Sequence, residues 1–428
     1  KELNYIIGNP PFVGARMMSS EQKDDALEIF GKKWKNVGNL DYVACWYKKA
    51  ADLMQGTAIR AALVSTNSIS QGEQVANLWQ PLMEDLKVHI DYAWRTFRWD
   101  SESNRKAHVH CVIIGFSVAQ NINAKLLFDR ESVMTHDNIN GYLIGAENVF
   151  VESRSKQISD APSIGIGNKP IDGGNYLFTK EEMEEFVSIE PSSKPFFHLW
   201  YGSEEFIHQK PRYCLWLGEC SPAQLKSMPH CLKRVENVRD FRLASSSLPT
   251  QKLAETPTRF HVENMPKGTS VLVPKVSSER RQYIPMGMIE PNHFCSDLVF
   301  LIPNATLYHF GILESSTHMA WMRTVCGRLK SDYRYSKDIV YNNFPWPTPT
   351  DAQKAKIERT AQAILDAREL FPDSSLADLY DEVSMPAELR KAHQQNDRAV
   401  MEAYGFAKDM SESDIVAALL KMYQELTK

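Results

Sequence analysis

The stretch Asn-Tyr-Ile-Ile-Gly-Asn-Pro-Pro-Phe, residues 4–12, decides the fold. Residues 4–8 are a short apolar run closed by a glycine, a pattern that predicts a buried parallel strand. The prolines that follow predict a stiff turn, because each fixes its own φ and asparagine also favours turns. Open α/β sheets bind ligands in loops at the carboxyl ends of parallel strands. Residues 9–12 are therefore the first candidate site, and a plain proline turn after a strand is the alternative.

Outward from this stretch, helical and strand patterns alternate along the chain. The order predicts an α/β fold: a partial Rossmann-like sheet with helices on both faces and an antiparallel hairpin closing its edge. The segment between the two hairpin strands, 94–106, is aromatic and basic. The expected helices lie near 20–31, 39–55 and 73–85, and the expected strands at 4–8, 59–64, 87–93 and 108–116.

Beyond residue 120 the pattern changes, and the sequence predicts three domains and a linker. Residues 1–150 form the sheet domain, and 151–195, where Gly, Asn, Ser and Pro accumulate, form the linker. Residues 196–347 are expected to be a mixed α+β domain, mainly strands and loops rich in aromatic side chains. A rigid connector at 345–349 leads into C-terminal helices, domain 348–428, near 351–370, 386–404 and 411–426.

The charge is spread unevenly along the chain. The formal net charge of -4 does not describe a uniformly basic nucleic-acid binder. Residues 241–350 are net positive and 351–428 net negative, which predicts one basic face on an acidic body. Hydrophobic residues make up 43% and charged residues 24%, ordinary for a globular protein, and no apolar run reaches the length of a membrane span.

The seven cysteines are spread singly, with no CxxC pair. This favours reduced thiols and a cytoplasmic location. The only crowding, Cys214, Cys220 and Cys231 beside His230, lacks zinc-finger spacing, so no metal site is expected. The sequence also shows no convincing nuclease motif.

The loop at residues 9–12 has the chemistry to hold an amine. The exocyclic amine of a nucleobase is a poor nucleophile, because its lone pair is conjugated into the ring. Two fixed acceptors, the Asn9 side-chain oxygen and the Pro10 carbonyl, can accept hydrogen bonds from its two N–H groups and so favour a tetrahedral nitrogen. Pro11 stiffens the loop. Phe12 can stack on a base that has left the duplex, which returns about 1–3 kcal/mol of the cost of flipping.

Asn-Pro-Pro-Phe after a strand resembles the catalytic loop of the class I amino-methyltransferases, which use S-adenosylmethionine. The resemblance implies that Asn9, Pro10, Pro11 and Phe12 hold and stack the target amine. Residues 38–42, Gly-Asn-Leu-Asp-Tyr, look like the next motif and imply Asn39 and Leu40 on the cofactor side. Residues 62–68 and 107–116 look like the following strands of that family.

One departure from that family concerns its cofactor loop, which is Gly-rich and lies upstream of the Asn-Pro-Pro loop. None precedes Lys1, and 165–167, Gly-Ile-Gly, lacks a strand–helix frame. We therefore expect a fragment that lacks an N-terminal part, with an incomplete S-adenosylmethionine site and no activity of its own. Mg²⁺ is expected only if an upstream nuclease domain exists.

The second half resembles the target-recognition domain of MmeI-like enzymes, which combine nuclease, methyltransferase and specificity in a single type II chain. The matching stretches are 213–217, 273–281, 327–336 and 341–347, and 385–393 extends the resemblance over nearly the whole chain. It implies double-stranded DNA as the partner.

Two basic, hydroxyl-rich strips in this region are suited to phosphate oxygens, and a solvated charged face is the alternative for either. Polar residues beside the strips are candidates for reading base edges. The first strip comprises Arg328, Lys330, Arg334 and Lys337, with Ser331, Tyr333 and Tyr335 between them; the second comprises Lys275, Ser277, Arg280 and Arg281; the base-reading candidates are Gln282, Tyr283 and the stretch Glu314 to His318, with Ser316 and His318 foremost.

The function these features predict is sequence-specific DNA adenine-N6 methylation in a restriction–modification enzyme. An RNA or protein amine methyltransferase is one alternative, and the large aromatic and basic second domain speaks against it. The other is a DNA-binding specificity module without catalysis of its own, which fits the missing cofactor loop.

Overall fold

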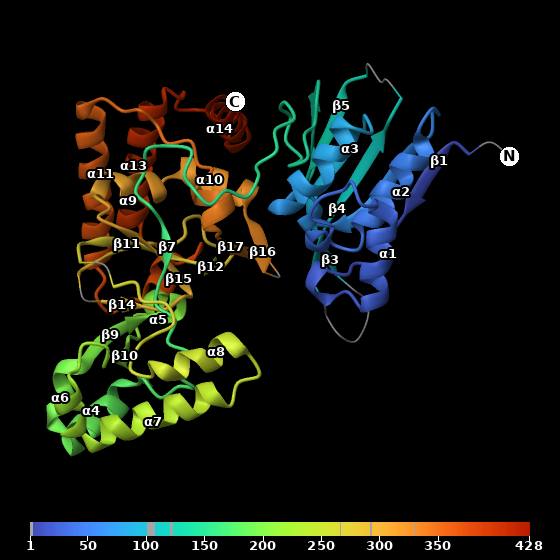
Figure 1. The fold of residues 1–428 in the computed structure, drawn as a ribbon. Helices are drawn as coiled ribbons and strands as arrows, with labels where there is room; N and C mark the ends of the chain where they lie inside the picture. The colour runs from blue at the N-terminus through green and yellow to red at the C-terminus, as the bar shows by residue number, and fades with distance from the viewer. Residues whose placement is uncertain (1–2, 101–107, 120–122, 266, 292, 330) are drawn as a thin grey trace. The chain divides into compact units, whose positions relative to one another are not determined.

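The chain folds into two units, each built from stretches that are far apart in the sequence. The computed structural model describes residues 3–100, 108–119, 123–265, 267–291, 293–329 and 331–428 (Figure 1). The first unit comprises Lys1–Asp160, Ala320–Pro347 and Phe406–Lys428, and the second comprises Ala161–Met319 and Thr348–Gly405.

The first unit contains a six-stranded sheet (Figure 1). Its strands are β1 (Tyr5–Gly8), β2 (Arg60–Thr66), β3 (His89–Asp100), β4 (His108–Ser117), β5 (Lys125–Asp129) and β6 (Ser132–His136). Their order across the sheet is β1-β2-β4-β3-β5-β6. β1, β2, β3 and β5 share one direction, and β4 and β6 run against it. The predicted α/β class is confirmed.

The sheet differs from the prediction at both edges. Within the described residues β1 is an edge strand and not a buried one, since Ile7 is 79% exposed and Tyr5 66%. At the other side the β3–β4 hairpin does not close the sheet, because β5 pairs in parallel with β3 and β6 pairs with β5. The sequences of the two added strands, Lys-Leu-Leu-Phe-Asp and Ser-Val-Met-Thr-His, do not alternate strictly between apolar and polar residues, so they lack the pattern that predicts a strand.

The helices of the first unit form close to their predicted places. α1 (Ser20–Phe30) begins after Ser19, whose side chain forms a reciprocal capping box with that of Gln22. α2 (Ala44–Met54) buries Tyr47, whose ring stacks on that of Phe116 in β4 with centroids 5.2 Å apart. The third helix starts as a wide π-helical turn, Val75–Trp79, and continues as α3 (Gln80–Glu84).

Two distant stretches complete the first unit. α10 (Ser316–Val325) leads into the hairpin of β16 (Gly327–Leu329) and β17 (Asp332–Arg334), and α14 (Glu412–Thr427) is the last helix. Trp321 is fully buried, and its ring centroid lies 6.0 Å from that of Tyr423 on α14. Arg323 forms a bidentate ion pair with Glu412, both N···O distances being 2.8 Å.

The second unit contains two four-stranded sheets. One has the order β13-β11-β15-β7, with β7 (Gly165–Ile166), β11 (Ser270–Pro274), β13 (Gly287–Ile289) and β15 (Val299–Pro303). The other has the order β14-β9-β10-β8, with β8 (Leu177–Phe178), β9 (Phe197–Tyr201), β10 (Arg212–Leu215) and β14 (Phe294–Cys295). A short strand, β12 (Val276–Ser277), follows β11. Trp200, Trp216 and Phe294 belong to the aromatic core around the second sheet.

Helices surround these sheets more densely than the sequence predicted. They are α4 (Lys180–Ile189), α5 (Ser203–Ile207), α6 (Pro222–Lys226), α7 (Pro229–Leu243), α8 (Leu248–Lys252), α9 (Leu307–Leu313), α11 (Asp351–Glu369), α12 (Leu376–Leu379) and α13 (Ala387–Tyr404). The linker expected over 151–195 is wrong from residue 161 on, because β7 and β8 pair within sheets and α4 is a capped helix.

Arg242, at the end of α7, holds the surrounding loops together. Its side chain is completely buried. The guanidinium donates to the backbone carbonyls of Pro170, Ile171, Leu253, Thr256 and Arg259 at 2.7–3.0 Å. A buried charge is tolerated when its donors are all satisfied in this way.

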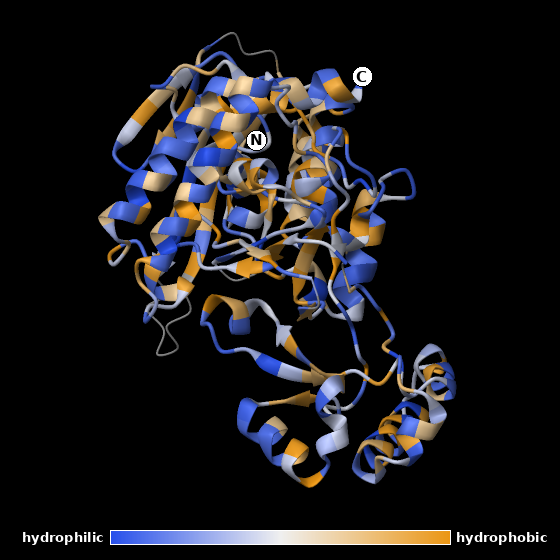
Figure 2. Cartoon of the chain, turned by 90° about the vertical axis from the view of Figure 1, so that its left-hand side faces the viewer, coloured by the Kyte–Doolittle hydropathy of each residue, from blue (hydrophilic) through white to orange (hydrophobic). Residues whose placement is uncertain are grey.

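The long C-terminal helices α11, α13 and α14 lie within two residues of their predicted bounds. Ile357, Ala361 and Ile364 form the buried stripe of α11. Helices of the molecule carry hydrophilic and hydrophobic residues side by side (Figure 2), as expected for helices that pack on one face. Among the described residues, no helix has the length and apolar character that crossing a bilayer requires.

Candidate active site

The Asn-Pro-Pro-Phe loop lies at the carboxyl edge of the six-stranded sheet. β1 and β2 are parallel, with Gly8 opposite Leu63, so the chain leaves both strands at one edge. The loop follows β1, and the turn Asn67–Ser70 follows β2. Pro10 is buried, Phe12 is half-buried, and Asn9 and Pro11 are exposed. The loop is therefore anchored in the fold without being sealed inside it.

Asp41 joins the loops at this edge. Its Oδ1 accepts the Ala15 N–H at 2.9 Å, just past the Asn-Pro-Pro-Phe loop. Its Oδ2 accepts the Ser68 hydroxyl at 2.6 Å, after β2. Beside it, the Tyr42 N–H donates to the Val13 carbonyl at 2.9 Å. One carboxylate that accepts from two loops holds them in register.

Buried polar groups support the same edge from below. Asn67 is 7% exposed, and its amide donates to the Thr96 hydroxyl of β3 at 3.5 Å. The hydroxyls of Tyr47 and Ser65 are 2.8 Å apart in the core, and burial raises the pKa of Tyr47 far above its ordinary value. The floor of the edge is thus a neutral, hydrogen-bonded network.

The Asn9 amide has no hydrogen-bond partner in the part of the chain that the structure describes, and its side chain is exposed. Asparagine directly after a strand commonly bonds to its own loop. Here the amide is left available to a ligand.

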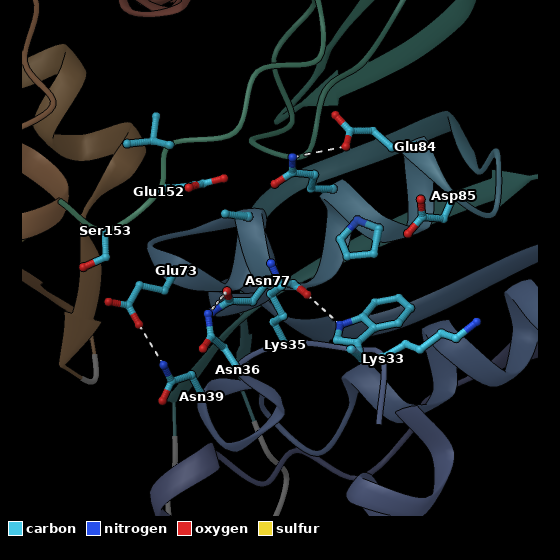
Figure 3. Close-up of a pocket in the computed structure, with 15 residues that line it drawn as sticks. Lys33, Lys35, Asn36, Asn39, Glu73, Asn77, Glu84, Asp85, Glu152 and Ser153 are labelled. Atoms are coloured by element: carbon cyan, nitrogen blue, oxygen red, sulfur yellow. Dashed lines mark hydrogen bonds between the residues drawn. The ribbon is translucent and has the colours of Figure 1, made fainter. Parts of the chain in front are cut away.

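The two predicted cofactor residues differ in burial. Leu40 is a core residue, only 2% exposed, so the predicted contact between its side chain and a cofactor is wrong. Its backbone is the part of Leu40 that a cofactor could reach. Asn39 is exposed, and its amide donates to the Glu73 carboxylate at 3.1 Å. Figure 3 shows Asn39 and Glu73 on a polar cavity of about 600 Å³, where Asn36 also donates to Asn77 at 3.1 Å.

The first predicted DNA strip lies on the β16–β17 hairpin, in the same unit as the loop. Arg334 is exposed. Arg328 is half-buried, donates to the carbonyl of the half-buried Ser331 at 3.0 Å and packs 4.0 Å from the Tyr333 ring centroid. Lys330 lies outside the described residues. Tyr335 is 2% exposed, so its assignment to DNA contact is wrong.

The second strip lies in the second unit and is only partly exposed. Lys275 donates to the Asp297 carbonyl, and its ammonium lies 4.6 Å from the Phe300 ring centroid. Arg281 donates to the Ser277 hydroxyl at 3.4 Å, and Ser277 is 2% exposed, which removes it from the DNA-contact set. Arg280 and Gln282 are exposed.

Two of the base-reading candidates are core residues, and their assignments are wrong. His318 is completely buried, and Tyr283 is 2% exposed, with its hydroxyl donating to Asp397 at 2.7 Å and its ring stacked on His393. Ser316 is half-buried, and its backbone N–H donates to Asp397 at 2.6 Å. Hydroxyl and imidazole groups suit buried networks as well as DNA, so their residue types alone did not separate the two roles.

Within the described residues, no group of three His, Cys, Asp or Glu side chains is placed to hold a metal ion. The cysteines are free thiols, and most are buried. Burial raises the pKa of Cys111 to about 11 and that of Cys295 to about 12, so both stay protonated near neutral pH.

An Asn-Pro-Pro-Phe loop at the carboxyl edge of this mixed sheet, with antiparallel β4 between β2 and β3, defines a methyltransferase-type α/β domain. Family models agree over almost the whole chain. The MmeI DNA-methyltransferase domain matches residues 1–129, the MmeI target recognition domain matches 145–348, and the MmeI C-terminal domain matches 349–428. The chain belongs to the MmeI family.

Two relatives are similar over its full length. "DNA methyltransferase A" of Bacillus subtilis (strain 168) is 41% identical over 424 residues, covering 99% of this chain and 48% of the relative. The solved structure of the Type IIL restriction–modification enzyme MmeI in complex with DNA is 44% identical, with a TM-score of 0.88, covering 99% of this chain and 57% of that one. The chain therefore spans about half the length of these relatives.

Proposed function

We propose that this chain is the catalytic-loop and DNA-recognition portion of an enzyme that methylates adenine N6 at a specific DNA sequence in a restriction–modification system. The observation that carries the proposal is the exposed, unpartnered Asn9 amide in a loop held by Asp41. The relative named as a DNA methyltransferase, and the related enzyme solved with DNA, support it.

The loop would act by positioning. The Asn9 side-chain oxygen and the Pro10 carbonyl accept hydrogen bonds from the two N–H groups of the adenine amine. These two hydrogen bonds direct the lone pair of the nitrogen out of the ring plane. Pro10 is buried and Asp41 fixes the loop beyond it, so the acceptors need no rearrangement during the reaction. Phe12 presents a half-buried ring for stacking.

The methyl donor in this proposal is S-adenosylmethionine, which supplies an electrophilic methyl group when bound. The exposed Asn39 amide and the Glu73 carboxylate beside it fit the polar groups of such a cofactor. Leu40 lends no side chain. The described residues thus fit one polar flank of the site.

Methylation by the full-length protein that contains this chain tests the role of Asn9. Labelled S-adenosylmethionine and duplex DNA are supplied, and the modified base is identified by mass spectrometry. Asn9→Ala should abolish N6-methyladenine while the Kd for DNA is unchanged, and Asn9→Asp, which keeps an acceptor, should retain part of the rate. Asn4→Ala, an exposed asparagine before β1, is the matched control. Full activity of Asn9→Ala would refute the role, and label on cytosine would refute adenine.

The exposed cations Arg280 and Arg334 are proposed to contact DNA phosphates. Arg334→Ala should weaken binding to every duplex and lower the slope of log K against log salt by about one. Arg60→Ala, an exposed arginine at the opposite end of β2, should leave both unchanged. A changed base preference at an unaltered salt slope would contradict a phosphate contact.

A further inference from the structure

A second cavity in the first unit opens beyond the end of β2. Its volume is about 620 Å³, within the range of sites that bind small organic ligands. Residues after β2, residues of β3 and β5, the stretch 323–328 and the start of α14 line it. Arg95, Arg130, Arg323 and Arg328 face two carboxylates, Asp129 and Glu412, so the lining is net positive. We call it the arginine cavity.

Two of these arginines are held rigidly by the fold. Arg95 donates to the Leu143 carbonyl at 3.0 Å, to Asp129 at 3.1 Å and to the Ser413 hydroxyl at 3.2 Å. Arg323 is paired bidentately with Glu412. Both arginines are thus fixed in place and their charges are compensated by Asp129 and Glu412, so the net positive charge of the cavity comes from Arg130 and Arg328 and favours an anionic ligand.

Two other lining groups have no partner in the described part of the chain. Arg130 is exposed and forms no hydrogen bond or ion pair there. Gln71 is only 9% exposed, yet its side-chain oxygen accepts no hydrogen bond from the described residues. A buried acceptor left unsatisfied destabilises a fold, so a ligand that donates an N–H to Gln71 would recover that cost.

Gln71 is also tied to the candidate active site. Its backbone N–H donates to the Ser68 carbonyl at 3.0 Å, and the Ser68 hydroxyl donates to Asp41. Asp41 in turn accepts the Ala15 N–H just past the Asn-Pro-Pro-Phe loop, so three hydrogen bonds connect Gln71, through Ser68 and Asp41, to the chain beside that loop. A ligand at Gln71 would share its scaffold with a base held at Asn9.

We propose that the arginine cavity binds one nucleotide of a DNA strand near the methylated base. Gln71 accepts an N–H from the edge of that nucleotide's base, and Arg130, backed by the fixed arginines, takes its phosphate. The inference rests on the proposed DNA function but concerns a site distinct from the Asn9 loop. It makes Gln71 a specificity-determining residue.

Selection from a pool of duplexes with a randomised centre, using this 428-residue chain, tests the assignment. Gln71→Ala should erase the preference at one position and weaken binding to the preferred duplex by about 5- to 100-fold, with other positions kept. Gln71→Met, which keeps the side-chain length without the acceptor, should behave alike and guards against misfolding. Arg130→Ala should weaken all duplexes equally and lower the salt slope by about one. Gln80→Ala and Arg60→Ala are the matched controls.

The outcomes separate the sources of the nucleotide. Wild-type preferences, Kd and salt slope in both Gln71→Met and Arg130→Ala would overturn the proposal. In a parallel titration with free deoxynucleoside monophosphates, binding that Gln71→Met abolishes without any change toward duplexes would assign the cavity to a free nucleotide and overturn the strand source. If the wild-type chain bound no duplex, the DNA-recognition function itself would fall, and this inference with it.

Discussion

Asp41 holds the loops of the candidate site together, because its two carboxylate oxygens accept from residues on different loops. Asp41 lies within the motif 38–42, in which its neighbours Asn39 and Leu40 carry the predicted cofactor roles. The motif could not show that the carboxylate reaches residues 15 and 68, since both partners are remote in the sequence.

Replacing Asp41 with asparagine keeps its size but leaves one acceptor oxygen for two donors. We expect Asp41→Asn in the full-length protein to lower the single-turnover methylation rate by about 10- to 100-fold, since small displacements of a positioning loop cost that much. The Kd for DNA should not change. Ser68→Ala should have a smaller effect of the same sign. Asp52→Asn, which removes the exposed carboxylate of a helical ion pair, serves as control, and a wild-type rate in Asp41→Asn would contradict the role.

His318 gives the molecule a pH dependence that its sequence position did not suggest. Burial lowers its pKa to about 3, whereas an unfolded histidine titrates near about 6.5. Between these values the unfolded chain binds a proton that the folded chain excludes. The stability of the folded state is therefore lost progressively as the pH falls below about 6.5.

Below about pH 6.5, His318→Gln should reduce the slope of the unfolding free energy against pH by up to about 1.4 kcal/mol per pH unit. Urea unfolding of the chain at a series of pH values from neutral downward measures the difference. The exposed His208→Gln is the matched control. Parallel curves for wild type and His318→Gln would show that His318 is not the titrating group.

At the scale of elements, the β3–β4 pair is the centre of the sheet that carries the site. Tyr92 of β3 lies opposite Gly115 of β4, and a Cβ on Gly115 would meet the Tyr92 ring at 2.1 Å. The glycine is required here by close approach and not by a turn. The sequence predicted both strands, at 87–93 and 108–116, but not which position would lie beneath an aromatic ring.

Gly115→Ala should lower the free energy of unfolding by about 1–3 kcal/mol, the usual cost of overpacking. In a Tyr92→Ala background, where the ring is absent, Gly115→Ala should lower the free energy of unfolding by less than it does in the wild type. Gly38→Ala, where nothing lies within 4 Å of the added atom, is the control. Chemical denaturation compares the midpoints, and an unchanged midpoint for Gly115→Ala would mean that the ring moves aside freely.

At the scale of the whole molecule, the units do not follow chain order. The first unit takes its last helix from residues 406–428, after the chain has passed through the second. The sequence-based domains, by contrast, were contiguous. Contiguity is the natural expectation when only local patterns are visible, because long-range packing leaves no periodic signal in the sequence.

Deleting residues 406–428 should therefore destabilise the first unit and spare the second. The deletion removes Tyr423, which is 3% exposed and packs against Trp321, so the Trp321 ring would lose this cover. Calorimetry should show one transition lowered by at least about 5 °C and the other unchanged. Removing only 426–428, where Leu426 is 51% exposed, is the control. Two unchanged transitions would contradict this division of the chain.

Features encoded in contiguous residues could be read from the sequence by itself. The strand and loop at 4–12, the long C-terminal helices and the motifs shared with the MmeI family are of this kind, because periodicity and turn chemistry act over a few neighbouring residues. The tertiary structure alone decided that Tyr283 and His318 are core residues while Gln282 and Arg280 are exposed, that Asp41 ties the loops, and that Gln71 faces a cavity. Each of these depends on partners distant in the sequence, and residue type does not specify which side of a fold a polar group will face.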